Sequence, residues 1–317
     1  MLEEVEHWLK QRSWSAADRP LDQLLAAKRA AGSRGTVSVV LPALDEEATV
    51  GEIVAAIRRE LMAGPVPLVD ELVVLDSGST DRTAAVAAAA GARVVHRDSV
   101  LPRLPALPGK GEVLWRSLLA TSGEIVCFVD ADLREFSADF VSGIVGPLLT
   151  DPDVHFVKAM YDRPLGDAAG QGGRVTELVA RPLLNLHWPL LAGFVQPLGG
   201  EYAARRSLLE RLPFPVGYGV ELGLLVDALH TVGLDALAQV DVGVRKHRHQ
   251  DGQALGRMAA AIYRTAQLRL ARGHLVRPAL TQFDRGEDGF VARTHAVDTE
   301  ERPPMAEIPE YVERRAA

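Results

Sequence analysis

The residues with the clearest chemistry are two aspartates, Asp130 and Asp132, which follow an apolar run of the chain. The run from Ile125 to Val129 is mostly β-branched or aromatic, which is typical of a buried strand. If the strand continues through them, both carboxylates point to the same side of the sheet. Two converging carboxylates suit Mg²⁺ or Mn²⁺, which proteins hold with one or two carboxylates together with substrate phosphates. By itself the short motif fits a solvated turn with helix-capping aspartates more readily, so the other motifs must decide.

Two further loops place acidic residues directly after predicted strands. Asp45 and Glu46 follow the first strand, and the loop 76–81 follows the second. Small and polar residues in such a loop let backbone amides face a ligand, while its aspartates accept hydrogen bonds from a base or a ribose. A capped strand-to-helix turn explains the second loop when it is considered alone. Because the carboxyl ends of parallel strands meet at one edge of a sheet, the three acidic strand ends together predict a single ligand crevice.

Cationic residues occur where helices are expected to begin. Lys110 lies between two glycines just before a helix, and Arg174 and Thr176 follow a glycine-rich loop at a second helix start. Free N–H groups and the helix dipole favour phosphate at such positions, although an ordinary helix start also explains the second motif. His247 and His249 alternate at the end of a predicted strand. They are interpreted either as a metal ligand and a substrate contact or as part of a basic surface patch with their Arg and Lys neighbours.

Alternating strands and helices are expected over the first half of the chain. The strands are predicted at 36–41, 71–75, 92–96, 125–129 and 155–161, and the helices at 49–61, 82–90, 112–120 and 137–149. This alternation is typical of βαβ crossovers and a largely parallel sheet. The acidic motifs then lie at the carboxyl edge of that sheet.

The rest of the chain is less regular. Helices are predicted at 2–9 and 21–31 on the surface, at 177–191, from about 217 to 230 and at 253–272, with a strand at 237–244. Beyond about 278 the sequence is charged and contains prolines, which predicts a loosely ordered tail.

The composition is that of an ordinary soluble globular protein. Its 317 residues are 47% hydrophobic, enough for a large core, and the net charge of −7 argues against broad nucleic-acid binding. The single cysteine, Cys127, excludes an internal disulfide and fits a reducing cytoplasm, while the acidic N-terminus lacks a secretory signal. The longest apolar segment, 183–195, is too short to span a bilayer.

Six motifs in order carry a family resemblance. They are Pro42-Ala43-Leu44-Asp45-Glu46-Glu47, Asp76-Ser77-Gly78-Ser79-Thr80-Asp81, Gly109-Lys110-Gly111, Asp130-Ala131-Asp132, Gly173-Arg174-Val175-Thr176 and Tyr218-Gly219-Val220-Glu221. Over about residues 36–275 the chain resembles the retaining nucleotide-sugar glycosyltransferases that make glucosyl-3-phosphoglycerate. Each motif is weak, but the six in this order are specific.

The resemblance implies an α/β fold of GT-A type, with a Rossmann-like, mostly parallel central sheet flanked by helices. It also implies an N-terminal helical extension and a C-terminal acceptor-binding part. The implied reaction moves glucose from UDP-glucose to 3-phosphoglycerate with Mg²⁺, or Mn²⁺, in a cytoplasmic homodimer that contributes to methylglucose lipopolysaccharide biosynthesis.

The resemblance also assigns roles to individual residues. It implies donor contacts by Pro42, Leu44, Glu46, Ser77, Lys110, Asp130, Tyr218 and Glu221, metal ligation by Asp132 and His247, and acceptor contacts by Gly173, Arg174 and Thr176. The family often has Asn two residues after the metal-binding histidine, where this chain has His249, so that acceptor contact stays open. Asp132, Lys110 and Glu221 are the expected catalytic residues, with Lys110 at the leaving group. Front-face attack and double displacement remain open, and Glu221 is the candidate nucleophile for the second route.

Other functions fit parts of the pattern. Mannosyl transfer from GDP-mannose and sugar transfer to a polyprenyl phosphate use similar motifs, and a non-catalytic nucleotide-sugar-binding protein needs no turnover. A sugar-nucleotide pyrophosphorylase is disfavoured because its glycine-rich, lysine-bearing loop is absent after Leu41.

The expected domain division has four parts. It comprises an N-terminal helical extension at 1–35, a nucleotide-sugar-binding half at 36–163, an acceptor-binding half with a dimerisation helix at 164–277, and the tail at 278–317.

Overall fold

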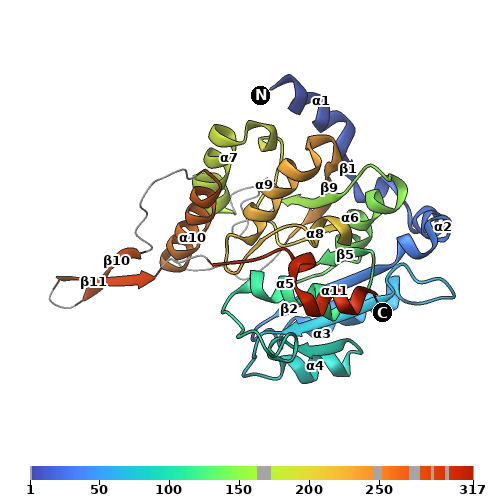
Figure 1. Ribbon diagram of the computed structural model, residues 1–317, viewed down its shortest axis with the longest axis horizontal. Helices are drawn as coiled ribbons and strands as arrows, with labels where there is room; N and C mark the ends of the chain where they lie inside the picture. Colours follow the sequence, from blue (N-terminus) through green and yellow to red (C-terminus); the bar gives the residue numbers. More distant parts are fainter. Residues whose placement is uncertain are drawn as a thin grey trace.

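A central β-sheet organises the molecule, a computed structural model that describes residues 2–162, 173–245, 252–270, 279–286, 289–296 and 300–316. The sheet has eight strands in the order β1-β9-β6-β7-β5-β2-β3-β4 (Figure 1). The strands are β1 (Ser13–Ser15), β2 (Val37–Ala43), β3 (Glu71–Asp76), β4 (Arg93–His96), β5 (Ile125–Phe128), β6 (Phe156–Asp162), β7 (Tyr202–Arg205) and β9 (Leu237–Val244). Neighbouring strands are parallel except at β7, which is antiparallel to β5 and β6. The prediction of a mostly parallel sheet flanked by helices is confirmed.

Helices cover both faces of this sheet because its strands are apolar on both sides. In β2, Val39 and Leu41 belong to one core and Val40 to the other. The helices are α1 (Glu3–Arg12), α2 (Leu21–Ala31), α3 (Val50–Leu61), α4 (Thr83–Ala89), α5 (Lys110–Ala120), α6 (Asp139–Thr150), α7 (Arg181–His187), α8 (Arg206–Leu209), α9 (Val220–Val232), α10 (Gly252–Leu270) and α11 (Pro309–Ala316). Buried residues of α2, α3, α4 and α6 fill one core, and those of α5, α7, α8, α9, α10 and α11 fill the other.

Two predicted elements differ in extent. Strand β5 ends at Phe128, so Asp130 and Asp132 lie in the turn beyond it and not within the strand. The helix expected at 177–191 is divided into the π-helical turn η4 (Thr176–Ala180), α7 and the short 3₁₀ turn η5 (Pro189–Leu191). Trp188 has the non-helical angles φ −133° and ψ 64°. The following Pro189 explains this break, since proline disfavours a helical conformation in the residue before it.

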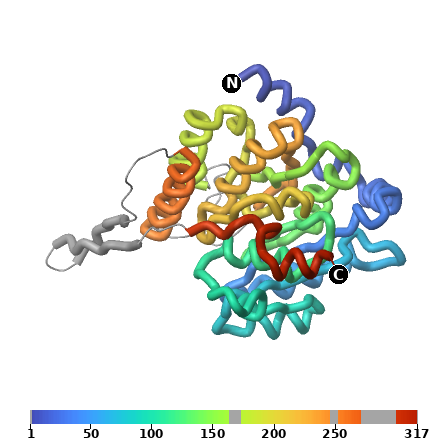
Figure 2. Tube along the Cα trace, in the orientation of Figure 1, coloured from blue at the N-terminus to red at the C-terminus, as the bar shows by residue number. Residues whose placement is uncertain are grey.

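The C-terminal segment 300–316 is more ordered than the predicted loose tail. Strand β12 (Glu301–Arg302) pairs with β8 (Phe214–Pro215), and Met305, Ile308 and Tyr311 are buried. The Trp115 indole N–H of α5 donates to the carbonyl of Pro303 at 2.9 Å. In Figure 2 this red segment runs across the side of the molecule where α5 lies. Three apolar residues at three-residue spacing anchor an otherwise charged stretch. The overall composition does not reveal them, which is why it predicts a loose tail.

The remaining strand pair is antiparallel, between β10 (Ala279–Gly286) and β11 (Gly289–Ala296). Among the described residues, we find no helix with the length and apolarity that membrane crossing requires. The domain division proposed from the sequence stays a prediction.

Candidate active site

A cavity of about 640 Å³ lies at the carboxyl edge of the sheet. Every predicted site residue that the structure describes lines it: Pro42, Leu44, Glu46, Ser77, Lys110, Asp130, Asp132, Gly173, Arg174, Thr176, Tyr218 and Glu221. His247 and His249 lie outside the described residues. The sequence motifs, spread over 180 positions of the chain, therefore converge on one space, as expected of a ligand crevice in an open α/β sheet.

The loops after β2 and β3 brace each other beside this cavity. The carboxylate of Asp45 accepts a hydrogen bond from the Thr80 amide at 2.7 Å, and the Glu46 amide donates to the Thr83 hydroxyl, also at 2.7 Å. Asp45 has a positive φ of 56°, a conformation that aspartate tolerates better than most residues. The two loops thus hold Glu46 and the rest of this wall in place through hydrogen bonds from backbone amides to side-chain oxygens.

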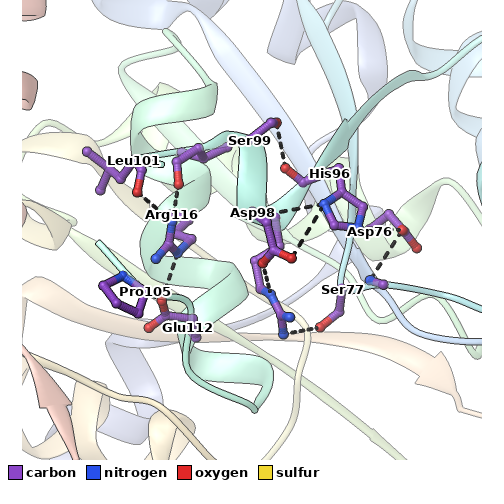
Figure 3. Close-up of polar contacts among 12 residues, drawn as sticks. Asp76, Ser77, His96, Asp98, Ser99, Leu101, Pro105, Glu112 and Arg116 are labelled. Carbon is purple, nitrogen blue, oxygen red and sulfur yellow. Dashed lines mark hydrogen bonds and ion pairs between the residues drawn. The ribbon is translucent and has the colours of Figure 1, made fainter. Parts of the chain in front are cut away.

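Asp76 stabilises its own loop and does not line the cavity. Its carboxylate is buried and accepts from the amides of Gly78 and Ser79 at 3.2 Å. The next residue, Ser77, does line the cavity and receives a hydrogen bond from Arg97 at 3.1 Å. Figure 3 shows Asp76 and Ser77 at this strand end, close to His96 and Asp98.

Lys110 reaches the cavity because α5 begins in close contact with another segment. A Cβ on Gly109 would lie 2.3 Å from the Val216 carbonyl oxygen, and one on Gly111 would lie 1.8 Å from that of Pro215, so only glycine fits at either position. The Lys110 ammonium pairs with Asp130 at 2.5 Å and with Glu221 at 2.8 Å. Burial lowers the pKa of Lys110, but these two carboxylates outweigh it and hold the pKa well above its usual range. The side chain is therefore a permanent cation.

Asp130 and Asp132 share a second cation, Arg245. Its guanidinium lies 2.7 Å from the Asp130 carboxylate and 3.4 Å from that of Asp132, and its Nε donates to Glu201 at 2.9 Å. Glu201 is fully buried and also accepts from the Tyr161 hydroxyl at 2.8 Å. Burial lowers the pKa of Arg245, but Glu201, Tyr161 and the two aspartates raise it well above its usual value.

The paired aspartates have the chemistry of a ligand set for a hard cation. Burial and the neighbouring Asp130 raise the pKa of Asp132, the situation of two carboxylates that lack enough positive charge between them. Among the described residues Asp132 receives one hydrogen bond, from Arg245, so its carboxylate retains acceptor capacity. The oxygen donors present therefore fit Mg²⁺ or Mn²⁺. A cluster of three or more His, Cys, Asp or Glu suited to a metal does not occur within the described ranges, which exclude His247.

The opposite wall carries the predicted acceptor residues. Gly173 has a positive φ of 78°, and its carbonyl accepts from the amide of Glu177, which starts the turn. Arg174 is exposed, whereas Thr176 is buried in the first position of η4. A helix thus begins at Arg174, as the sequence predicts, and passes through the π-helical turn η4 into α7.

Tyr218 and Glu221 occupy the start of α9. Tyr218 is half exposed in the cavity wall, and Glu221 is buried against Lys110. The ion pair of Lys110 with Glu221 connects α9 to the nucleotide side of the cavity.

Sequence reasoning missed several members of this site. From the sequence, Arg245 is only one of the basic neighbours of His247, and Gly200 and Glu201 have no predicted role. A Cβ on Gly200 would lie 2.3 Å from the Asp130 carboxylate, so the glycine makes room for that side chain. The apolar wall from α10, formed by Leu255, Met258 and Ile262, was also unassigned. The glycine pair at 199–200 before an acidic residue was the available signal.

Comparisons with known proteins agree with this geometry. Residues 38–189 match the family model described as glycosyl transferase family 2. A relative from Mycolicibacterium smegmatis, named glucosyl-3-phosphoglycerate synthase, is 50% identical over 305 residues, which cover 95% of this chain and 98% of the relative.

Two solved structures are similar over nearly the whole chain. The structure of glucosyl-3-phosphoglycerate synthase from Mycobacterium tuberculosis with Mn²⁺, UDP-glucose and phosphoglyceric acid has a TM-score of 0.81 and 48% identity, and the match covers 90% of this chain and 94% of that one. Mannosyl-3-phosphoglycerate synthase from Rubrobacter xylanophilus has a TM-score of 0.88 and 39% identity, with 96% and 99% covered.

Proposed function

This chain belongs to the glucosyl-3-phosphoglycerate synthases of glycosyl transferase family 2, and from that premise we propose that it transfers glucose from UDP-glucose to the 2-hydroxyl of 3-phosphoglycerate with retention of configuration. The observation that carries the proposal is the convergence of every described donor, acceptor and metal residue on one cavity. A solved relative that is 48% identical holds Mn²⁺, UDP-glucose and phosphoglyceric acid together.

We assign the nucleotide to the wall formed by the ends of β2, β3 and β5. Pro42, Leu44, Glu46 and Ser77 would contact the nucleoside. Asp132, with His247, would hold the divalent cation, which when bound supplies a Lewis acid for the charge that builds on the departing diphosphate. Lys110, fixed as a cation between Asp130 and Glu221, is placed to stabilise the same negative charge.

The sugar and the acceptor take the other wall. Tyr218 and Glu221 would hydrogen-bond the glucose hydroxyls, and Gly173, Arg174 and Thr176 would bind the phosphate and carboxylate of 3-phosphoglycerate. The exposed guanidinium of Arg174 suits a bidentate contact to either anionic group. This arrangement would orient the acceptor hydroxyl toward a donor sugar bound beside Glu221.

The test is UDP release from UDP-glucose with Mg²⁺, measured with and without 3-phosphoglycerate and again after EDTA. We expect release that requires both the acceptor and the metal. Release that is absent with every donor and acceptor of a panel, although UDP binds, would instead identify a nucleotide-sugar-binding protein.

Mannosyl transfer is the second candidate for the same site. It is favoured by the TM-score of 0.88 to mannosyl-3-phosphoglycerate synthase. Parallel assays with UDP-glucose, GDP-glucose and GDP-mannose distinguish the two functions, because the competing reactions share the acceptor and differ in the donor. A kcat/KM for GDP-mannose above that for UDP-glucose would reassign the donor.

We further propose that the enzyme is cytoplasmic, because its proposed substrates are cytoplasmic metabolites, and that it forms a homodimer, as the family resemblance implies. The half-exposed apolar residues Tyr263, Leu268 and Leu270 of α10 are candidates for the subunit contact. Light scattering during gel filtration tests the oligomeric state.

A further inference from the structure

A second cavity, of about 370 Å³, lies apart from the donor and acceptor residues. It is an open pocket lined by β4, the loop 99–103, the end of α5 and α11. The lining residues are Arg93, Val95, Ser99, Val100, Leu101, Pro102, Arg103, Leu119, Ala120, Glu310 and Arg314. None of them lines the cavity described above, so this space is not where the donor and acceptor of the proposed glucosyl transfer would bind.

The charges on this cavity are unbalanced. Arg93, Arg103 and Arg314 come from three separate segments, and Glu310 is the one carboxylate in the lining. Arg93 is already engaged by Glu71 at 2.6 Å. Arg103 and Arg314 have no ion pair or hydrogen bond within the part of the chain that the structure describes. Two guanidinium groups thus remain available to an anion.

The floor of the cavity is apolar and its backbone is strained. Val100 and Leu101 are buried, with Val95 and Leu119 beside them. Leu101 has φ +54°, in the left-handed region that a large side chain rarely adopts. Such strained residues cluster at ligand clamps, where the surrounding structure enforces them. An apolar floor below free guanidinium groups suits a ligand with one apolar and one anionic part.

We propose that this cavity, which we call the arginine pocket, binds a small amphiphilic anion. Its phosphate, sulfonate or carboxylate group would pair with Arg103 and Arg314, and its apolar body would lie on Leu101 and Leu119. The occupant is a metabolite-sized molecule, since the cavity measures about 370 Å³.

The arginine pocket is linked to the donor cavity by the segment between them. The buried Arg116 of α5 donates to the carbonyls of Val100, Leu101 and Leu104, which fixes the pocket wall to the helix that begins with Lys110. Figure 3 shows Arg116 reaching Leu101 on one side, with Ser77 just after β3 and Asp98 in the 3₁₀ turn after β4. Arg97, just before this wall, donates to Ser77. We therefore expect ligands in the two cavities to influence each other's affinity.

The binding test uses the fluorescence of 8-anilinonaphthalene-1-sulfonate, an apolar ring system with a sulfonate, in the presence of saturating UDP and Mg²⁺. The double variant Arg103→Ala/Arg314→Ala is expected to bind this probe at least about tenfold more weakly than the unmodified chain. Glu310→Gln is expected to bind it more tightly, because a like charge is removed. The control Arg34→Ala changes a single exposed arginine elsewhere and is expected to leave affinity unchanged.

Equal probe affinity in the double variant and the unmodified chain would overturn the proposal. Both substituted arginines are exposed, so the melting temperature of each variant serves to confirm an intact fold. An equal loss in Arg34→Ala would show that the probe senses overall charge alone, which also overturns it.

The linkage test measures the probe's affinity with and without UDP and Mg²⁺, and then UDP affinity with and without the probe. Reciprocal coupling requires the same factor in both directions. Only the binding component lost in Arg103→Ala/Arg314→Ala is counted, which removes any competition inside the donor cavity. A factor of one in both directions would overturn the linkage, whether or not the chain proves to be a glucosyltransferase.

Discussion

The two walls of the active-site cavity are built by different means. On the nucleotide wall, the loops after β2 and β3 are fixed by hydrogen bonds between side chains and backbone amides, such as Asp45 with Thr80. On the wall formed by β7, β9 and α9, the fixed points are ion pairs between buried side chains. Arg245 with Glu201 and Lys110 with Glu221 are the main examples.

The difference teaches which substitutions each wall tolerates. Backbone amides stay in place when one side chain changes, so the nucleotide wall should lose local contacts only. A buried charge that loses its partner costs several kcal/mol, because it is no longer compensated. The charged wall should therefore respond as a unit, and the following predictions test this contrast.

The largest effect is expected at Asp132. Asp132→Ala removes a proposed metal ligand, and we expect turnover to fall by at least about a thousandfold, with a similar loss after EDTA. The melting temperature should not decrease, because the variant removes a carboxylate whose pKa is raised by burial and by repulsion from Asp130. UDP-release assays and thermal unfolding measure the two quantities.

Glu52→Gln is the control for this prediction, since it removes an exposed carboxylate on α3. If Asp132→Ala kept an activity near that of the unmodified chain, Asp132 would not be a metal ligand of the reaction.

The next effect is expected at Arg245. Arg245→Met leaves the fully buried Glu201 and the two aspartates without their shared cation, so we expect a loss of about 3 kcal/mol in unfolding free energy and a strong loss of activity. Adding Glu201→Gln should recover part of the stability, because the uncompensated buried charge is removed. Urea unfolding of the single and double variants measures this coupling. Strict additivity of the two substitutions would show that the ion pair does not organise this wall.

The same contrast explains how much of the fold and of the site could be predicted from the sequence. The βα units were predicted closely because their signals are local: apolar runs, and glycines such as Gly91 after α4, which has φ +99°. The motifs at the ends of these strands were then placed by topology alone, and the structure confirms that they meet.

Long-range partners were beyond such reasoning. Arg245 and Glu201 are 44 positions apart and meet only because β7 and β9 both flank β6. Strand β1, with the sequence Ser-Trp-Ser, has no local strand pattern and exists because it extends the sheet beside β9, next to the bond from the Trp8 indole to the Leu237 carbonyl. Order in the C-terminal segment depends on the partners Trp115 and β8, which no local pattern reveals.

A smaller and more selective effect is expected from single contacts on each wall. Arg174→Ala should raise the KM for 3-phosphoglycerate by about ten- to a hundredfold while the donor KM changes little, because one charged contact is lost. Ser77→Ala is the matched variant on the nucleotide wall and should raise only the donor KM, by a few-fold. Steady-state kinetics with each substrate varied in turn provide both constants. If Arg174→Ala raised only the donor KM, Arg174 would contact the donor and not 3-phosphoglycerate.

The smallest effect on activity is expected at Lys158, a buried residue of β6 behind the charged wall. Its ammonium donates to the Gly199 carbonyl and lies 4.9 Å from the centre of the Tyr202 ring. Burial lowers its pKa to about 8. In the unfolded chain the pKa of a lysine is about 10.4. Between about pH 8 and pH 10.4 the unfolded state therefore binds more protons than the folded state, so the free energy of unfolding rises with pH over this range.

Lys158→Met removes the buried charge, and with it both the cost of burying that charge and the rise in stability with pH. Relative to the variant, the unmodified chain should therefore become more stable above pH 8, by up to about 1.4 kcal/mol per pH unit, while turnover at pH 7.5 stays within about twofold. Urea unfolding of both proteins from pH 7 to 9.5 measures the difference. Parallel stability curves over that range would mean that Lys158 keeps an ordinary pKa, and that charge burial behind this wall is compensated more fully than the contacts with Gly199 and Tyr202 suggest.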